Sequence, residues 1–207
     1  MIRFFIYLTT LLLSFVLFAQ NDSIKPNLPK LTFEISAGLG TGNYEVQNQP
    51  NLNGNSTLLS MNLMYRASKT LEFGLGYYQS AFNANTMLEN EWSEISRTSS
   101  LIPVQARFHF DLFNTYKSPF DFYVGIGAGP NFAIKEKIES SISTITDKSQ
   151  KTNWKYLVNF GLNIALSKQS FFTINYTNLG DINATKYNNI ERKLNSGTVN
   201  MGFGYFY

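Results

Sequence analysis

Few side chains of this 207-residue sequence could take part in chemistry, and the most reactive is a single histidine, His109. There is no cysteine. General acid and base catalysis uses histidine most often, and zinc sites combine several histidine or cysteine ligands. One histidine without a thiol excludes most base-assisted mechanisms, any two-histidine metal site and any disulfide framework. The sequence therefore predicts no catalytic residue, no metal and no cofactor.

Five charged side chains form a second candidate group, because they stand in segments that are otherwise small, polar or apolar. They are Glu34, Arg66, Glu72, Arg107 and Lys155. Charges of mixed sign in a narrow interior are expected to pair, which offsets the cost of removing them from water. Together with His109 they are predicted to form a polar network that fills the interior. The alternative is a gate whose opening admits small ions.

A glycine-rich segment at 123–129, YVGIGAG, has only a superficial similarity to a phosphate-binding loop. It lacks the Lys-Ser/Thr pair and the following helix that such a loop requires. The excess of 17 basic over 14 acidic side chains is also too small to indicate nucleic-acid binding. The glycines stand at every second position, which suits a crowded interior face.

The elements that position these residues show the two-residue period of β-strands. From residue 31 to 41 the odd positions are apolar, and the even positions are small or polar. The same alternation recurs, giving eight predicted strands at about 31–41, 59–67, 71–78, 102–110, 122–129, 154–166, 172–177 and 199–207.

The connections between these strands alternate between short and long. Three short turns fall near 68–70, 114–119 and 167–170, whereas long polar stretches follow residue 41 and occupy about 82–97, 134–152 and 179–195. Outer-membrane barrels have short turns at one end, longer loops at the other and an even strand number. The predicted fold is all-β: an eight-stranded antiparallel up-and-down transmembrane β-barrel over residues 31–207.

The composition of the two strand faces favours a membrane barrel. Charged residues make up 15% of the sequence, against about 25% in typical domains, and aromatic residues also reach 15%. One face carries large apolar side chains. The other carries Gly, Ser, Asn and Thr, which make a poor solvated exterior but can fill a narrow lumen. A soluble lipocalin-like barrel, with the opposite sense of facing, stays open as an alternative.

The N-terminus has the pattern of an export signal. Arg3 precedes an uninterrupted apolar run over 4–18, and Ala19 precedes a polar segment. Residues 1–19 are predicted to be a cleaved signal peptide, and residues 20–30 a periplasmic lead-in. Export followed by barrel formation predicts location in the bacterial outer membrane.

Four segments carry a resemblance to a known family: 102–110 (IPVQARFHF), 123–129 (YVGIGAG), 175–181 (NYTNLGD) and 199–207 (VNMGFGYFY). They are similar to the OmpA-like small barrels of the opacity-protein and surface-antigen type, also described as porin-family β-barrels. The resemblance implies outer-membrane lipid as the surroundings. It also implies that the barrel-assembly machinery reads the last strand, whose outward aromatic residues here are Phe203, Tyr205 and Tyr207. A terminal Tyr207 departs mildly from the commoner phenylalanine.

These observations predict a non-enzymatic outer-membrane barrel with a role in envelope structure or in adhesion through its surface loops. A surface ligand is expected, if at all, on the long loops. The alternatives are a low-conductance pore for small solutes and a secreted soluble ligand-binding barrel.

Overall fold

The structure is a computed structural model that describes residues 31–207 except 89–90, 111–119, 141–143, 148–151, 168 and 188–189. The predicted signal peptide (1–19) and lead-in (20–30) lie outside the described residues. No helix in the described part of the chain is long and apolar enough to span a membrane. The strands are β1 Leu31–Val46, β2 Leu52–Arg66, β3 Leu71–Leu88, β4 Glu91–Leu101, β5 Val104–Phe110, β6 Phe120–Ser140, β7 Thr144–Asp147, β8 Asn153–Ala165, β9 Ser170–Asp181, β10 Thr185–Tyr187 and β11 Ile190–Phe206.

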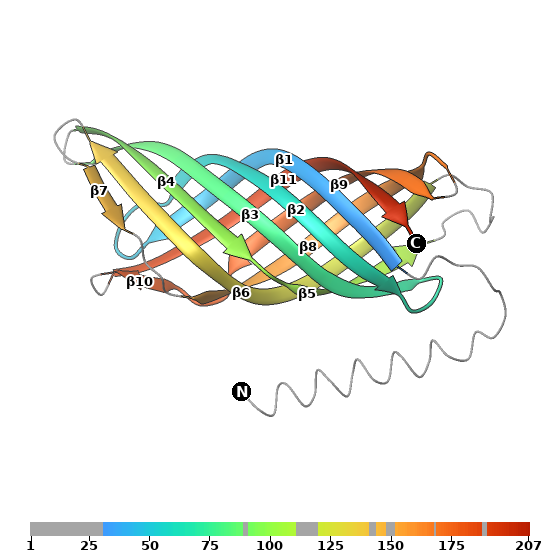
Figure 1. Cartoon of the computed structure of the whole chain (residues 1–207). Coiled ribbons are helices and arrows are strands. Elements are labelled where there is room, and N and C mark those ends of the chain that lie inside the picture. The colour runs from blue at the N-terminus through green and yellow to red at the C-terminus, as the bar shows by residue number, and fades with distance from the viewer. Residues whose placement is uncertain are drawn as a thin grey trace, which may run out of the picture.

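These strands form one closed antiparallel ring (Figure 1). The ring closes where β1 pairs with β11, from Thr32 opposite Phe206 to Val46 opposite Arg192. β4 and β5 occupy a single ring position between β3 and β6, because Pro103 interrupts the strand. Proline lacks the N–H that the ladder would use, although its carbonyl still accepts a 3.1 Å bond from the Gly76 N–H. β7 and β10 each pair with one neighbour only, at the far end of the barrel.

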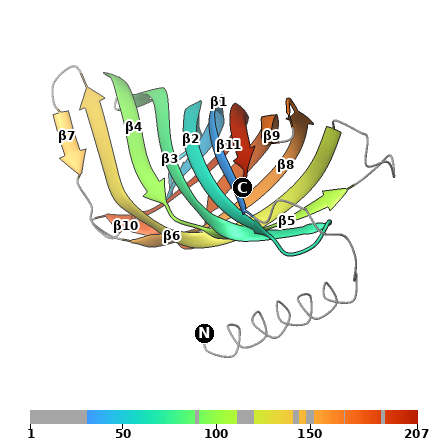
Figure 2. The ribbon, with the colours of Figure 1, turned by 45° about the vertical axis from the view of Figure 1, so that its right-hand side comes forward.

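Eight strand positions therefore complete the ring, which confirms the predicted fold class. Figure 2 shows that the strands curve around a common interior. We call the end where β1 begins and β11 ends the terminal end, and the opposite end the rim.

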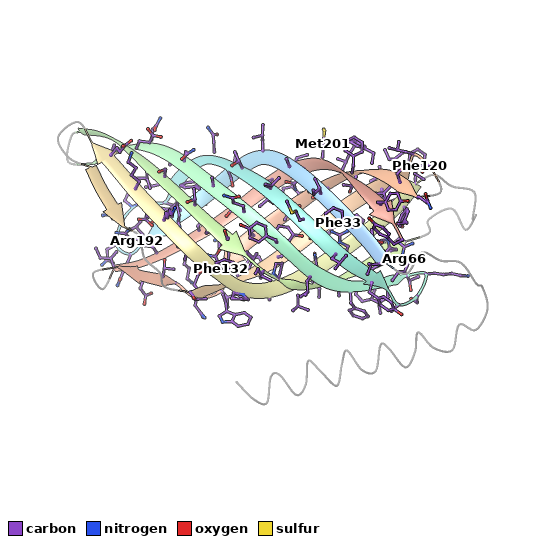
Figure 3. The ribbon with its side chains drawn as sticks, in the orientation of Figure 1. Phe33, Arg66, Phe120, Phe132, Arg192 and Met201 are labelled. Carbon is purple, nitrogen blue, oxygen red and sulfur yellow. The ribbon has the colours of Figure 1, made fainter. Side chains whose placement is uncertain are left out.

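Large apolar side chains point away from the barrel along most of its length. Leu39 is 72% exposed and Met201 57% exposed, while Glu34 and Ser36, which lie on the other face of β1, are buried. Figure 3 shows Phe33, Phe120 and Met201 on the outside of the ring. An exposed apolar surface of this extent is unusual on a soluble monomer and suits contact with lipid. We call it the apolar belt.

The stretches expected to be long loops are in large part strand, and that expectation was wrong. β3 continues to Leu88 and β4 begins at Glu91, so 82–97 is mostly a hairpin. β6 likewise runs on to Ser140, and β11 already begins at Ile190. Beyond the apolar belt the outward positions become polar, while inward positions such as Tyr44, Phe82 and Ile95 are apolar, so the outward apolar pattern that marks the belt ends. Backbone hydrogen bonds between strands do not depend on the side-chain pattern, so the pairing of β3, β4 and β6 continues into the rim.

Glycine at inward positions makes room for the polar side chains of neighbouring strands. Gly125 on β6 faces Asn159 on β8, and a Cβ atom at Gly125 would overlap the Asn159 side-chain oxygen. Asn159 is buried. The alternate glycines of 123–129 therefore serve interior packing.

We expect Gly125→Val to destabilise the barrel by about 1–3 kcal/mol, the usual range for overpacking a filled interior. Urea unfolding in lipid vesicles, followed by heat-modifiable gel mobility, measures the change. Ala128→Val, which adds bulk to the outward face of the same strand, is the matched control and should leave the midpoint nearly unchanged. Equal midpoints for both variants would contradict a packed interior at Gly125.

Candidate functional site

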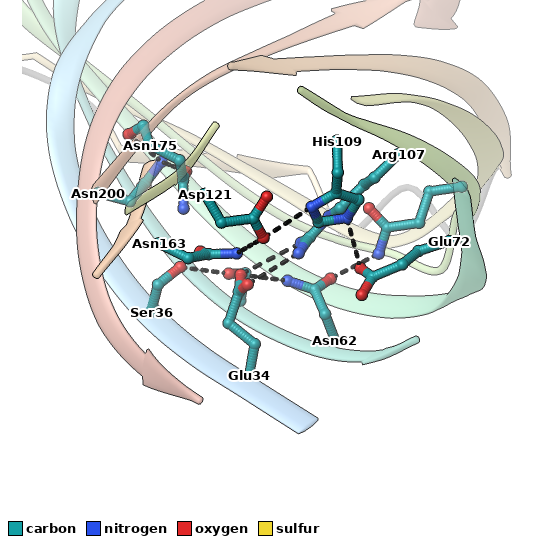
Figure 4. Close-up of polar contacts among 12 residues, drawn as sticks. Glu34, Ser36, Asn62, Glu72, Arg107, His109, Asp121, Asn163, Asn175 and Asn200 are labelled. Carbon is teal, nitrogen blue, oxygen red and sulfur yellow. Dashed lines mark hydrogen bonds and ion pairs between the residues drawn. The ribbon is translucent and has the colours of Figure 1, made fainter. Parts of the chain in front are cut away.

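The barrel interior holds a charged cluster near the terminal end, which we call the terminal-end network (Figure 4). Its members project inward from β1, β2, β3, β5 and β6: Glu34, Asn62, Arg66, Glu72, Arg107, His109 and Asp121. These side chains point inward because side chains alternate along a strand and their sequence neighbours point outward, as part of the apolar belt. Five strands thus contribute to one connected cluster.

The strongest contact of this network crosses the lumen. Arg107 of β5 forms a two-pronged ion pair with Glu34 of β1, with N–O distances of 2.8 and 3.2 Å. β1 and β5 are not neighbours in the ring. Asn62 donates a further 3.0 Å bond to Glu34, and the Arg107 guanidinium lies 4.6 Å from the Tyr123 ring centroid. Two-pronged pairing fixes direction as well as distance, so this contact ties opposite walls together.

His109 lies between two carboxylates. Its Nε2 is 3.0 Å from Glu72 Oε2, and its Nδ1 is 2.8 Å from Asp121 Oδ2. Arg66 contacts the same two carboxylates, at 2.8 and 3.4 Å. An imidazole donates through both nitrogens only when it is protonated. A protonated His109 gives this network three positive and three negative groups; its Nδ1 is hydrogen-bonded to Asp121, and its Nε2 lies within ion-pair distance of Glu72 without a hydrogen bond.

An apolar layer crosses the interior beyond the terminal-end network. Leu58, Tyr78, Leu101, Leu157 and Leu179 pack into one cluster, and each is buried. They come from β2, β3, β4, β8 and β9, which lie on different sides of the ring. We call this cluster the leucine layer. It separates the terminal-end network from the charges nearer the rim.

A second charged cluster, the rim-side network, lies beyond the leucine layer and is formed by Arg97, Lys155 and Asp181. Asp181 lies 3.3 Å from Arg97 Nη2 and 3.5 Å from Lys155 Nζ, and it accepts a 2.9 Å bond from the Leu194 N–H. All three charged side chains are buried. Lys155 and Asp181 lie opposite each other, two residues from Leu157 and Leu179 respectively in the direction of the rim. The network is therefore one inward row closer to the rim than the leucine layer.

Further contacts lie inside the rim end of the barrel. Tyr44 and Phe82 pack with Ala84, Ile95 and Leu194 in an apolar cluster. Arg192 of β11 pairs with Glu136 of β6, two strands that are not neighbours in the ring. Figure 3 labels Arg192 at this end. Charged and apolar layers thus alternate along the barrel axis.

The sequence matches the family of the outer membrane protein beta-barrel domain over residues 9–206. The chain belongs to this family. The search of curated proteins found no match to this sequence.

Solved structures resemble this outer membrane beta-barrel at low sequence identity. Neisserial surface protein A is 18% identical, with 84% of this chain and 97% of that chain covered and a TM-score of 0.53. The outer membrane protein OprG from Pseudomonas aeruginosa is 14% identical over 86% and 97%, with a TM-score of 0.51. The outer membrane protease OmpT from Escherichia coli is 8% identical over 89% and 99%, with a TM-score of 0.52. At these identities the likeness concerns the fold alone.

Within this barrel, the structure distributes the six interior residues singled out in the sequence over two clusters. Glu34, Arg66, Glu72, Arg107 and His109 come together in the terminal-end network, whereas Lys155 belongs to the rim-side network. No cluster among the described residues has three side chains arranged to hold a metal ion.

Sequence reasoning missed three charged members of these networks. Asp121 has the same parity as Tyr123 and Gly125, so extending the alternation by one step would have found it. Asp181 likewise continues the inward positions of β9. Arg97 lies in a stretch expected to be a loop, where no face could be assigned.

The three aromatic residues predicted to be read by the assembly machinery lie on the outer surface. Phe203, Tyr205 and Tyr207 are 62%, 37% and 71% exposed, and the Tyr205 hydroxyl donates to Gln169 at 2.9 Å. Recognition of these three residues by the assembly machinery stays a prediction.

We expect Arg107→Met to lower the free energy of unfolding by about 3–5 kcal/mol, because Glu34 is left buried and charged without its partner. The double variant Arg107→Met/Glu34→Gln should recover much of this loss, since both charges are then removed. Urea midpoints in lipid vesicles measure both. A double variant as unstable as the single one would contradict the charge-pair explanation.

Proposed function

We propose that the protein is a non-enzymatic barrel with a closed lumen, exported to the bacterial outer membrane, which acts through its rim in envelope structure or adhesion. The filling of the interior carries this proposal. The leucine layer separates two buried charged networks, and its five side chains reach inward from several sides of the ring. Eight strands enclose little more space than their own side chains occupy. This supports a structural or recognition role over solute passage.

The position of the only histidine supports a non-enzymatic role. His109 is buried in the lumen near the terminal end, and both of its ring nitrogens face carboxylates. A general base needs a free nitrogen within hydrogen-bond reach of a substrate. The likeness to OmpT concerns the fold and brings no catalytic group to this chain.

The rim supports a role in recognition. On β1 the outward apolar positions end at Leu39, but the strand continues through the outward Thr41, Asn43 and Glu45. β6 continues eight residues beyond Phe132, to Ser140. Hydrogen-bonded strands therefore extend past the apolar belt and present a preformed polar surface. In this proposal the rim faces outward, lipid surrounds the belt, and the assembly machinery reads Phe203, Tyr205 and Tyr207.

We expect no stepwise conductance when the purified barrel is inserted in planar lipid bilayers at neutral pH, because the leucine layer interrupts any polar path. Heat-modifiable mobility of the same preparation verifies that the protein is folded. Uniform conductance steps that increase in number with the protein added would overturn the closed lumen and favour the low-conductance pore.

The adhesion role is tested by shortening the β3–β4 hairpin. Replacing residues 85–94 with Asn-Gly joins Ala84 to Ile95, which already face each other across the two strands. The belt and both networks are untouched, so we expect a folded barrel. Cells expressing it should be retained severalfold less on immobilised matrix proteins and polysaccharides. A Gly-Ser insertion between Ser68 and Lys69, at the opposite end, is the control. Equal retention of shortened and complete proteins would contradict recognition by this hairpin.

A further inference from the structure

The outer wall has a polar hollow just beyond the apolar belt, with a volume of about 430 Å³. Its lining residues come from four strands, β2, β1, β11 and β9, which are adjacent in the ring. The residues that line it are small or carry amides: Thr41, Gly42, Asn43, Asn53, Gly54, Asn178, Asn195, Ser196 and Gly197. We call it the asparagine hollow.

Strand register brings three of the asparagines into one row. Asn195 of β11 lies opposite Asn43 of β1, and Asn43 lies opposite Asn53 of β2. These side chains face outward, because the adjacent Tyr44 and Leu194 are buried inside the barrel. Asn43 donates a 3.2 Å bond to Asn53, but its own side-chain oxygen is buried without a hydrogen-bond partner. An amide acceptor thus stands unused at the centre of the row.

A glycine in the wall of the hollow makes room for a tyrosine. Gly197 lies opposite both Thr41 and Asn178, in the row next to the asparagines. It has no side chain, and a Cβ atom there would meet the Tyr176 hydroxyl group. Tyr176 is 44% exposed and lies opposite Val199, in the row on the belt side of Gly197.

The chemistry of the hollow suits an uncharged ligand with many hydroxyl groups. Each asparagine side chain offers two N–H donors and one carbonyl acceptor. A hydroxyl group can accept from the former and donate to the latter. No charged side chain lines the hollow. In the next row towards the rim, Glu45 and Lys193 lie opposite each other, so their charges offset. A phosphate group would find no cation within the hollow itself.

The position of the hollow indicates where the ligand comes from. The row below it contains Leu39 and Val199, which face each other and are 72% and 54% exposed. A ligand in the hollow would lie at headgroup level, with any attached acyl chains continuing over these two side chains. We propose that the asparagine hollow binds the uncharged sugar headgroup of a glycolipid in the surrounding leaflet. The inference rests on the family assignment and not on the closed lumen, so conductance results do not affect it.

The experiment uses the full barrel in phosphatidylcholine nanodiscs that contain glucosyl diacylglycerol, unglycosylated diacylglycerol or phosphatidylglycerol. We expect the side-chain amide NMR signals of Asn43, Asn53 and Asn195 to shift with the glucosyl lipid only. The variant Asn43→Ala/Asn195→Ala should retain this lipid at least about tenfold less in native mass spectrometry, as the loss of two or more hydrogen bonds predicts. Heat-modifiable mobility shows whether the variant is folded.

Asn83→Ala/Asn85→Ala is the matched control, because these two asparagines also face outward but lie on β3, outside the hollow. It should retain the glucosyl lipid like the unchanged protein. Retention by the hollow variant at the unchanged level overturns the proposal, and so do equal amide shifts with phosphatidylglycerol. Soluble maltose supplied without lipid distinguishes a free sugar from a glycolipid: equal occupancy by maltose would overturn the choice of a lipid-borne ligand.

Discussion

Backbone hydrogen bonding in a medium without water is the constraint on which this structure depends. An unpaired N–H or C=O group in hydrocarbon costs several kcal/mol, so a sheet that crosses lipid has to close on itself. Here β1 and β11 pair along fifteen consecutive positions and remove both edges. Even the break at Pro103 is compensated, because its carbonyl still accepts a bond from Gly76. The apolar belt can face lipid only because this ring is complete.

Closure with eight strand positions also determines what the interior can contain. The lumen is narrow, so bulky inward side chains alternate with glycine, as at Gly125 beside Asn159. Charges inside it have to be paired, and Arg107 finds Glu34 on a strand that is not its neighbour. Such pairs stabilise little against a well-packed apolar interior, but leaving one partner alone is costly. The leucine layer adds apolar packing between the two charged networks.

The outer surface changes character within one or two rows of side chains. Leu39 and Val199 end the belt, and the asparagines at 43, 53 and 195 follow almost at once. Polar uncharged side chains at this level suit a headgroup region better than they suit hydrocarbon. The strands themselves continue to the rim, so the transition is presented on a rigid, hydrogen-bonded wall.

The sequence by itself determined the fold, the inward face and the polarity of the lumen, because an alternation of period two records which side of each strand meets lipid. It also placed Glu34, Arg107 and His109 inside. It could not determine partners across the lumen, because closure brings together strands that are distant in the chain. It also mistook the rim for loops, since the outward apolar positions end at the belt and the apolar side chains of the rim point inward instead. The leucine layer, the separation of Lys155 from the other charges and the asparagine hollow follow from register and barrel closure, and only the tertiary structure decided them.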